Sequence, residues 1–325
     1  MLTLGPLSWA SVEIFTGNAN GVAGHMKAVR IHTFGGAEVL RLDEVEIPQP
    51  KPGEVLVRIK AASINPVDYK IREGHFPRIT GRDLPMTLGR DVCGVMEDGA
   101  KQREILALLE WNQGGYAEYV ALPRALCILK PRTLSMDEAA SVPLAAMTAW
   151  QGLFQYGHLQ GGQRVLIHAG AGGVGHFAVQ FAAACGADVV STATDKNIDF
   201  VRELGAGKVI DYTKQRFEDE VRDVDLVFDL VGGETRDRSW KVLRQGGALI
   251  STLGQPDEIK AAAHRVRAKG YMTATNASQL EEIASLIESG KVRPVVTKAF
   301  ALDEAAAGQR YVENGHPRGK VVLTV

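Results

Sequence analysis

The chain has 325 residues, of which 45% are hydrophobic and 23% charged, and its formal net charge is −1. This is the composition of an ordinary globular protein, and the length favours two domains over a single core. The balanced charge argues against a nucleic-acid or anionic-membrane partner, and no apolar run approaches the roughly 20 residues of a bilayer span, so we expect a small-molecule ligand.

The first 25 residues differ from those that follow. Residues 1–25 contain apolar stretches but no basic segment, and Glu13 interrupts them, so they make a poor signal peptide. From Met26 the sequence alternates like a strand. We therefore expect the fold to begin at Met26, with residues 1–25 as an extension outside it.

Residues 26–134 are rich in strand signals. Residues 54–60 alternate with a period of two after a proline-rich turn, and residues 116–120 indicate a further short strand. At Ser135 the pattern becomes helical, since Ser135 suits a helix N-cap and Glu138 follows three residues later.

Strands and helices alternate from residue 165 onward. Apolar strands are predicted over residues 165–168, 188–191, 208–210, 225–228 and 248–251, with helices up to Cys185 and from about Asn197 to Leu204. This alternation predicts a parallel sheet covered on both faces. A helix over residues 280–289 then precedes strand character at 320–325. The expected fold is α/β, with a doubly wound Rossmann domain (135–274) inserted into a β-rich domain (26–134 and 275–325).

The loop after the strand at 165–168 is rich in glycine, comprising Gly170, Gly172, Gly173, Val174 and Gly175 with one alanine. Gly170 permits a tight turn, Gly172 lets the backbone approach a diphosphate, and Gly175 allows close packing of the helix. The N-terminus of that helix supplies oriented N–H donors. The order strand, glycines, helix predicts a dinucleotide site; a glycine-rich packing turn without a ligand is the alternative.

The end of the next strand indicates which dinucleotide binds. An acidic residue there would bind the ribose 2′-hydroxyl of NAD, but Thr192 occupies that place. The hydroxyls of Thr192 and Thr194 and the charge of Lys196 suit a 2′-phosphate instead. Asp195 would repel a phosphate unless it is a solvated turn residue. NADPH is therefore the predicted cofactor.

Several motifs lie in a characteristic order along the chain. They occupy residues 26–29, 61–70, 89–94, 114–119, 143–150, 168–175 and 318–322. Together they resemble the medium-chain dehydrogenase/reductase superfamily, specifically its zinc-free quinone oxidoreductase and alkenal (enone) reductase branch. The resemblance covers nearly the whole chain from Met26 and implies that the β-rich domain is GroES-like.

The resemblance also implies chemistry without a metal. Zinc-dependent relatives use a thiolate and an imidazole on the catalytic ion, and this chain has Asn65 and Arg90 at those positions. Without a Lewis acid, oxidation of simple alcohols is disfavoured, whereas hydride transfer to a polarised double bond is feasible. The expected function is NADPH-dependent reduction of quinones or α,β-unsaturated carbonyls. An NADPH-binding protein with little activity and an alcohol dehydrogenase are the alternatives.

By resemblance, Asn65 and Tyr69 line the nicotinamide and substrate pocket, and Lys70 bonds the cofactor ribose or the substrate carbonyl. Tyr69 could equally be a packed aromatic residue, and Lys70 a solvated lysine. His168 and His176 have positions typical of structural histidines rather than acid–base groups.

The resemblance implies further cofactor contacts outside the glycine loop. Thr148, Tyr212, Leu253, Gly254 and Arg318 take positions that contact the cofactor in relatives, Tyr212 near the 2′-phosphate and the pair at 253–254 beside the nicotinamide. Thr148 could instead bond its own helix backbone, and Arg318 could be a surface residue.

One segment departs from the family pattern. Between Gly94 and Gly114 the sequence is highly charged and about a dozen residues shorter than expected, so a strand there is predicted to be lost or rebuilt. Resemblance also predicts a homodimer, through the strand at 248–252 as a sheet edge.

The cysteines bear on the compartment. Cys93, Cys127 and Cys185 are few, odd in number and widely spaced, so neither a disulfide framework nor a metal-ligand pair is expected. We therefore predict a reducing compartment, the cytoplasm.

Overall fold

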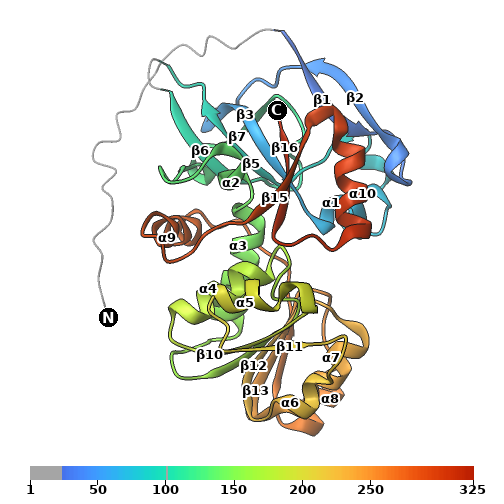
Figure 1. Cartoon of the computed structure of the whole chain (residues 1–325). Coiled ribbons are helices and arrows are strands. Elements are labelled where there is room, and N and C mark those ends of the chain that lie inside the picture. Colours follow the sequence, from blue (N-terminus) through green and yellow to red (C-terminus); the bar gives the residue numbers. More distant parts are fainter. Residues whose placement is uncertain (1–23, 100–101) are drawn as a thin grey trace.

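The computed structural model describes residues 24–99 and 102–325. Its strands form a six-stranded parallel sheet and a β-rich part. In Figure 1 the parallel sheet lies in the lower half and the β-rich part in the upper half. The predicted α/β class is confirmed. The expectation for residues 1–25 falls outside the described residues except at Gly24 and His25, and the first strand begins at His25 rather than Met26.

The strands are β1 (His25–Ile31), β2 (Leu40–Glu46), β3 (Glu54–Ile64), β4 (Met86–Thr87), β5 (Asp91–Met96), β6 (Arg103–Leu108), β7 (Tyr119–Pro123), β8 (Ile128–Leu129), β9 (Arg164–Ile167), β10 (Asp188–Ala193), β11 (Lys208–Asp211), β12 (Val224–Asp229), β13 (Leu243–Ser251), β14 (Arg267–Gly270), β15 (Val296–Ala301) and β16 (Lys320–Thr324). The α-helices are α1 (Pro66–Arg72), α2 (Met136–Ala140), α3 (Pro143–Trp150), α4 (Gly175–Ala184), α5 (Ile198–Glu203), α6 (Phe217–Glu220), α7 (Gly233–Ser239), α8 (Glu258–His264), α9 (Ala277–Glu288) and α10 (Ala305–Gly315).

The parallel sheet has the strand order β11-β10-β9-β12-β13-β14. Because side chains alternate along each strand, Val165 and Ile167 of β9 pack into one core with Phe177 of α4. Leu166 between them packs into the opposite core with Trp240. The order reverses between β9 and β12, and in doubly wound sheets a ligand binds outside the carboxyl ends of the strands at such a point.

The β-rich part combines a three-stranded sheet (β2-β1-β4) with a seven-stranded one. In the larger sheet, β16 pairs antiparallel with β3, placing Val322 opposite Ser63. A strand from the end of the chain thus lies beside one from its first quarter. Where one domain ends and the next begins stays a prediction, because α9 buries Leu280 and Ile283 in a core that also receives residues of the β-rich sheet.

Helix α3 connects the two parts and lies between them in Figure 1. It contacts β5 and β6 on one side and α4 and α9 on the other. The predicted N-cap at Ser135 is confirmed, since its hydroxyl accepts from the N–H of Glu138 and its own N–H donates to that carboxylate. The helix it opens is short, however: α2 ends at Ala140, α3 starts at Pro143, and a π-helical turn (Gln151–Tyr156) follows.

The charged segment at 94–113 keeps its strand. β5 pairs antiparallel with β6, which then pairs with β8, so the predicted loss of a strand is wrong for the described residues. Charged side chains beside the hairpin turn form surface ion pairs, Glu97 with Arg58 and Asp98 with Arg124, each at 2.9 Å.

The expected dimer edge also differs. The strand at 248–252 belongs to β13, which β14 covers on its outer side, so it is not an edge. β14 has only charged, small and glycine residues, Arg267-Ala268-Lys269-Gly270, and therefore lacks the apolar alternation that predicts a strand.

Candidate active site

The glycine loop (residues 170–175) leads from β9 into α4. A Cβ atom on Gly170 would clash with the hydroxyl oxygen of Ser191 on β10, and one on Gly175 with the carbonyl oxygen of Ala169. Packing therefore requires glycine at both positions. A Cβ on Gly172 would make only ordinary contact, 3.4 Å from the same carbonyl oxygen. Glycine at 172 instead leaves the outer side of the loop open to a ligand.

The backbone of the loop has free donors. Gly173 and Val174 are partly exposed, and their N–H groups donate to no acceptor within the described part of the chain. Unpaired N–H groups at the start of a helix bind anions, and phosphates in particular. The loop therefore fits the diphosphate of a dinucleotide.

Basic side chains lie beyond the end of β10. Arg318 donates to the side-chain oxygen of Asn197 at 3.1 Å and to the carbonyl oxygen of Lys196 at 3.3 Å. Asp195, the acid that would repel a phosphate, forms an exposed ion pair with Lys214 at 2.9 Å. Lys214 is shared with Asp211, which lies 3.4 Å from it, so the positive charge available to an anion at this edge comes from Lys196 and Arg318.

The hydroxyls predicted near the ribose differ in their surroundings. Thr192 is buried, accepts from the N–H of Ala169 at 3.1 Å and lies 3.2 Å from Nδ1 of His168, so it braces the glycine loop. Thr194 is half-buried and Tyr212 is 54% exposed, at the ends of β10 and β11. Their contacts with the cofactor stay predictions.

Both histidines near the loop are engaged within the protein. Nε2 of His168 lies 2.9 Å from the hydroxyl of Ser239. His176 donates from Nδ1 to the carbonyl of Gly172 at 3.0 Å and accepts at Nε2 from the N–H of Val295 at 3.3 Å. Burial lowers the pKa of each histidine to about 4, so both are neutral at physiological pH.

A buried polar network surrounds Asn65. Its amide nitrogen donates to Asp91 at 2.8 Å, and its oxygen accepts from the ammonium group of Lys320. The hydroxyl of Ser63 also donates to Asp91. The second oxygen of Asp91 accepts from the N–H of Leu144 at 2.5 Å, in the first turn of α3. The network thus joins β3, β5, β16 and α3.

Lys320 connects this network to the glycine loop. It is only 3% exposed, and a Cβ on Gly173 would lie 3.2 Å from its Cδ atom. The N–H of Gly319 donates to the carbonyl of Ala171 at 2.8 Å. Sequence reasoning missed the role of Lys320, although a lysine opening the buried strand Lys320–Thr324 was a usable signal, because a buried lysine requires a partner.

Asp68 lies on the other side of Asn65. Its carboxylate accepts from the N–H of Asn65 at 2.7 Å and from the hydroxyl of Tyr116 at 2.9 Å. Burial raises the pKa of Asp68 to about 7, with the charge of Asp91 adding to the effect and that of Lys320 opposing it. Asp68 thus fixes the backbone at the start of α1.

The other two predicted catalytic residues lie on α1. Tyr69 and Lys70 are half-buried, and neither side chain forms a hydrogen bond with a described residue. Burial raises the pKa of Tyr69, and Glu313 and Glu73 raise it further. Of the three residues, only Asn65 belongs to the buried network, and the roles of Tyr69 and Lys70 stay predictions.

Thr148 and the turn after β13 complete the predicted set. The Thr148 hydroxyl donates to the carbonyl of Leu144 at 2.6 Å, and it lies 2.6 Å from the hydroxyl of Thr273. Leu253 is 37% exposed, and Gly254 has a φ of +89°, which a residue with a side chain rarely adopts. Their nicotinamide contacts stay predictions.

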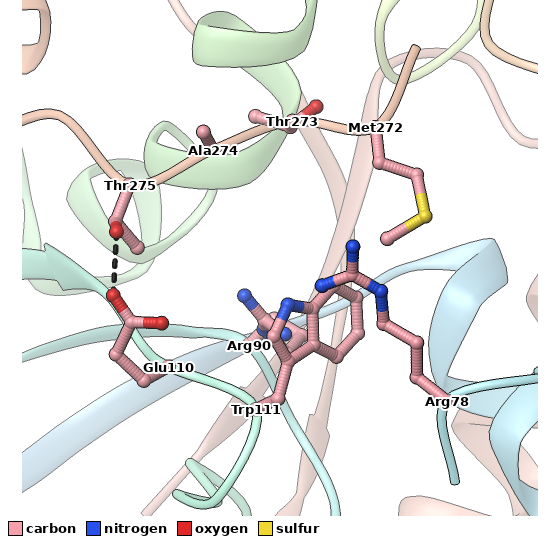
Figure 2. A pocket seen from close by; sticks show the side chains of 8 residues that line it. All are labelled: Arg78, Arg90, Glu110, Trp111, Met272, Thr273, Ala274 and Thr275. Atoms are coloured by element: carbon pink, nitrogen blue, oxygen red, sulfur yellow. Dashed lines mark hydrogen bonds between the residues drawn. The ribbon is translucent and has the colours of Figure 1, made fainter.

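A cavity of about 220 Å³ opens beside Thr273. Figure 2 shows the eight side chains that line it, which come from the β-rich part and from the segment after β14: Arg78, Arg90, Glu110, Trp111, Met272, Thr273, Ala274 and Thr275. Arg90, directly before Asp91, connects the cavity to the Asn65 network. Sequence reasoning identified Arg90 only as the residue in place of a zinc ligand.

Two further features bear on the class of protein. Across residues 24–99 and 102–325, no three or more His, Cys, Asp or Glu side chains are grouped so as to hold a metal ion. In the same residues, no helix is both long and apolar enough to cross a bilayer.

A doubly wound sheet with a free glycine loop, joined to a β-rich part whose last strand touches that loop, defines the class of two-part nucleotide-dependent oxidoreductases. Comparison with known families agrees. Residues 51–132 match the alcohol dehydrogenase GroES-like domain, and residues 204–323 match the zinc-binding dehydrogenase family.

Individual relatives narrow the class. The chain is 34% identical to a 2-methylene-furan-3-one reductase of Solanum lycopersicum, over 95% of this chain and 81% of the relative. It is 35% identical to the chloroplastic NADPH-dependent alkenal/one oxidoreductase of Arabidopsis thaliana, over 92% and 79%. The solved structure of the quinone oxidoreductase from Coxiella burnetii superposes with a TM-score of 0.87 at 33% identity, over 93% and 100%. The chain belongs to the medium-chain dehydrogenase/reductase superfamily, in its quinone and alkenal/enone oxidoreductase branch.

Proposed function

We propose that the protein is an NADPH-dependent reductase of quinones or α,β-unsaturated carbonyl compounds. The observation that carries the proposal is the contact through Lys320, which joins the diphosphate loop to the polar network around Asn65. A nucleotide on the loop and a substrate near Asn65 would therefore be neighbours. The named activities of the relatives support the same reaction class.

The reaction balances without a metal. When bound, NADPH supplies a hydride to the β-carbon of the substrate. The π electrons of the double bond then move to the carbonyl oxygen as an enolate, and a proton from solvent adds at the α-carbon to give the saturated carbonyl. A quinone takes up the same hydride and one proton to give the hydroquinone.

The residues of this chain position the reactants. The N–H groups of Gly173 and Val174 bind the diphosphate, and the basic edge at Lys196 and Arg318 binds the 2′-phosphate. Because both ends of its amide are occupied, Asn65 holds Lys320 against the loop rather than polarising the substrate directly.

The test is a turnover assay with matched substrates. NADPH oxidation is followed by the absorbance of the reduced nicotinamide, with uncharged enones, ortho-quinones and the saturated ketone that corresponds to each enone. We expect oxidation with enones or quinones and none with saturated ketones. Tight NADPH binding without turnover of any substrate would contradict the proposal, and so would equal rates with saturated ketones.

We also propose how the protein assembles and where it is located. We infer a homodimer formed through β14, the outer strand of the parallel sheet. Sedimentation equilibrium is the measurement, and a monomer at micromolar concentration would contradict the inference.

We also infer a reducing compartment, the cytoplasm, since Cys93, Cys127 and Cys185 are free thiols.

A further inference from the structure

The cavity beside Thr273 has one wall that carries an unused positive charge. Arg90 is only 4% exposed, and its Nε and Nη1 atoms are buried without a hydrogen-bond partner within the described residues. Leaving a buried charged donor without a partner is energetically unfavourable. A buried arginine held in this state is typical of a site that is completed by a ligand.

Arg90 is held by stacking of its guanidinium plane rather than by hydrogen bonds from its N–H groups. Its guanidinium carbon lies 3.5 Å from the centroid of the Trp111 ring, and Trp111 stacks in turn on Phe76 at 4.7 Å. Stacking of this kind orients the guanidinium plane while the N–H groups along its edge stay available. Arg90 is therefore preorganised to donate hydrogen bonds.

The charges around the cavity do not cancel. Figure 2 shows Arg78 near Trp111, so the wall has two guanidinium groups. Neither arginine forms an ion pair with a described residue. Glu110 is the single acid of the wall, and its carboxylate accepts from the hydroxyl of Thr275 at 2.5 Å. Among the residues that line the cavity, two arginines therefore face one acid. Asp68 and Asp91 also act electrostatically on Arg90, but neither forms an ion pair with it.

The cavity, with its two arginines, lies beside the network around Asn65, where the substrate is proposed to bind. Thr273 of its wall lies 2.6 Å from Thr148 of α3, and Arg90 precedes Asp91, the acid that holds Asn65. Trp111 and Met272 provide apolar surface beside the two arginines. A molecule reduced near Asn65 could therefore extend its far end into the cavity.

We propose that this cavity is a subsite for a carboxylate, and that the preferred substrates are α,β-unsaturated ketones or aldehydes with a carboxylate at the end remote from the reacting double bond. The inference rests on the proposed reductase function and names its substrate class. No side-chain nitrogen of Arg90 donates a hydrogen bond to a described residue, so each two-donor edge of its guanidinium, Nε with Nη2 or Nη1 with Nη2, is available. Such an edge, with a second arginine beside it, matches a permanent anion with two oxygen atoms better than the single oxygen of a transient enolate.

The experiment uses 7-oxooct-5-enoate and its methyl ester, which have the same enone but differ at the remote end, where only the acid is charged. With the wild-type protein and NADPH, kcat/KM for the acid is expected to exceed that for the ester by about 10-fold or more. Arg90→Met is expected to lower kcat/KM for the acid by about 10- to 100-fold, chiefly through KM, and to change that for the ester little.

Two further variants serve as a second probe and a control. Arg78→Gln changes an exposed side chain that folding does not require, and it is expected to weaken the preference for the acid in the same direction. Arg82→Gln removes an equal charge from an exposed position that does not line the cavity, and it is expected to leave the preference unchanged.

Thermal unfolding verifies that each variant is folded. Arg90→Met is expected to be at least as stable as the wild type, because an unpaired buried charge is removed.

The outcomes separate this inference from the reductase proposal. Normal turnover of the ester without preference for the acid overturns the carboxylate subsite and leaves the reductase function intact. An equal loss of kcat for both substrates in Arg90→Met also overturns it, since Arg90 would then act on the reacting carbonyl. If neither compound is reduced, calorimetry with saturated 7-oxooctanoate and the NADP⁺-loaded protein decides: binding that Arg90→Met abolishes supports the subsite, and no binding overturns it.

Discussion

Lys320 and two acids determine the charge balance where the glycine loop meets the β-rich sheet. Burial lowers the pKa of Lys320, whereas Asp91 and Asp68 raise it. Asp91 is satisfied by three donors, but one oxygen of Asp68 has no partner among the described residues. The two carboxylates therefore differ: both oxygens of Asp91 accept hydrogen bonds, whereas burial raises the pKa of Asp68 to about 7.

Asp68→Asn tests this difference. The folded pKa of Asp68 is about 7, above its unfolded value of 3.8, so its contribution to stability is present below pH 4 and lost as the pH rises to 7. Asparagine can accept the same two hydrogen bonds without a charge. We expect the variant to gain stability relative to the wild type between pH 5 and 8, by up to about 4 kcal/mol. Urea unfolding at pH 5 and pH 8 measures the gain; an equal effect at both pH values would contradict the assignment.

Lys196→Ala tests the basic edge at the end of β10. Loss of a charge-assisted bond to a 2′-phosphate is expected to raise the Kd for NADPH about 10-fold and to leave that for NADH nearly unchanged. Fluorescence titration with both nucleotides provides the comparison. Lys291→Ala, an exposed lysine elsewhere, is the control. Equal weakening of both nucleotides would argue against the 2′-phosphate site.

Residue chemistry was predictable from sequence where a local pattern determines it. The glycine at 175 and the cap at Ser135 are of this kind, because their partners, Ala169 and Glu138, lie within six residues of them. The burial of Arg90 and the hydrogen bond from Lys320 to Asn65 depend on residues that are distant in sequence. No local pattern indicates that a lysine at 320 meets Asn65.

At the level of elements, the glycine loop and α4 form one packed unit. Gly175→Ala would push a methyl group against the carbonyl of Ala169, and we expect it to destabilise the protein by about 1–3 kcal/mol. Gly172→Ala is the matched comparison, since its methyl group meets nothing closer than 3.4 Å.

We expect Gly172→Ala to unfold at nearly the wild-type urea concentration but to bind NADPH more weakly, because the methyl group stands where the diphosphate approaches. Urea unfolding and NADPH titration of both variants measure the two effects separately. If Gly172→Ala bound NADPH as tightly as the wild type, the loop would not be the diphosphate site.

Elements with strong periodicity were predicted, and elements determined by tertiary context were not. The apolar strands β9, β10 and β12 follow from their sequences, as does α9 within a few residues of its ends. β14 is charged, and α10 lies between the predicted helix at 280–289 and the predicted strand at 320–325, so neither element was predicted. In α10, Gly308 and Gln309 face the core, which weakens the helical pattern of apolar residues.

At the scale of the whole molecule, the free energy of unfolding is expected to depend on pH. His168 and His176 have folded pKa values of about 4 against 6.5 when unfolded, so the unfolded chain binds two more protons between these values and stability falls as the pH drops from 6.5 to 4. Asp68 acts with the opposite sign over the same range. The three groups together predict a slope of about 1.4 kcal/mol per pH unit.

The urea midpoint between pH 6.5 and 4.5 measures this slope. His168→Asn is expected to lower this slope by the equivalent of about one proton bound on unfolding. His75→Asn, at a position that is 73% exposed, is the control and is expected to leave the slope unchanged. A slope that stays the same in His168→Asn would show that acid unfolding starts elsewhere.

The bond between Lys320 and Asn65 joins residues that are 255 positions apart. During synthesis, the parallel sheet and its glycine loop emerge completely while β3 still lacks the strand that will lie beside it. The residues of the diphosphate loop are therefore made well before the strand that joins this loop to the Asn65 network.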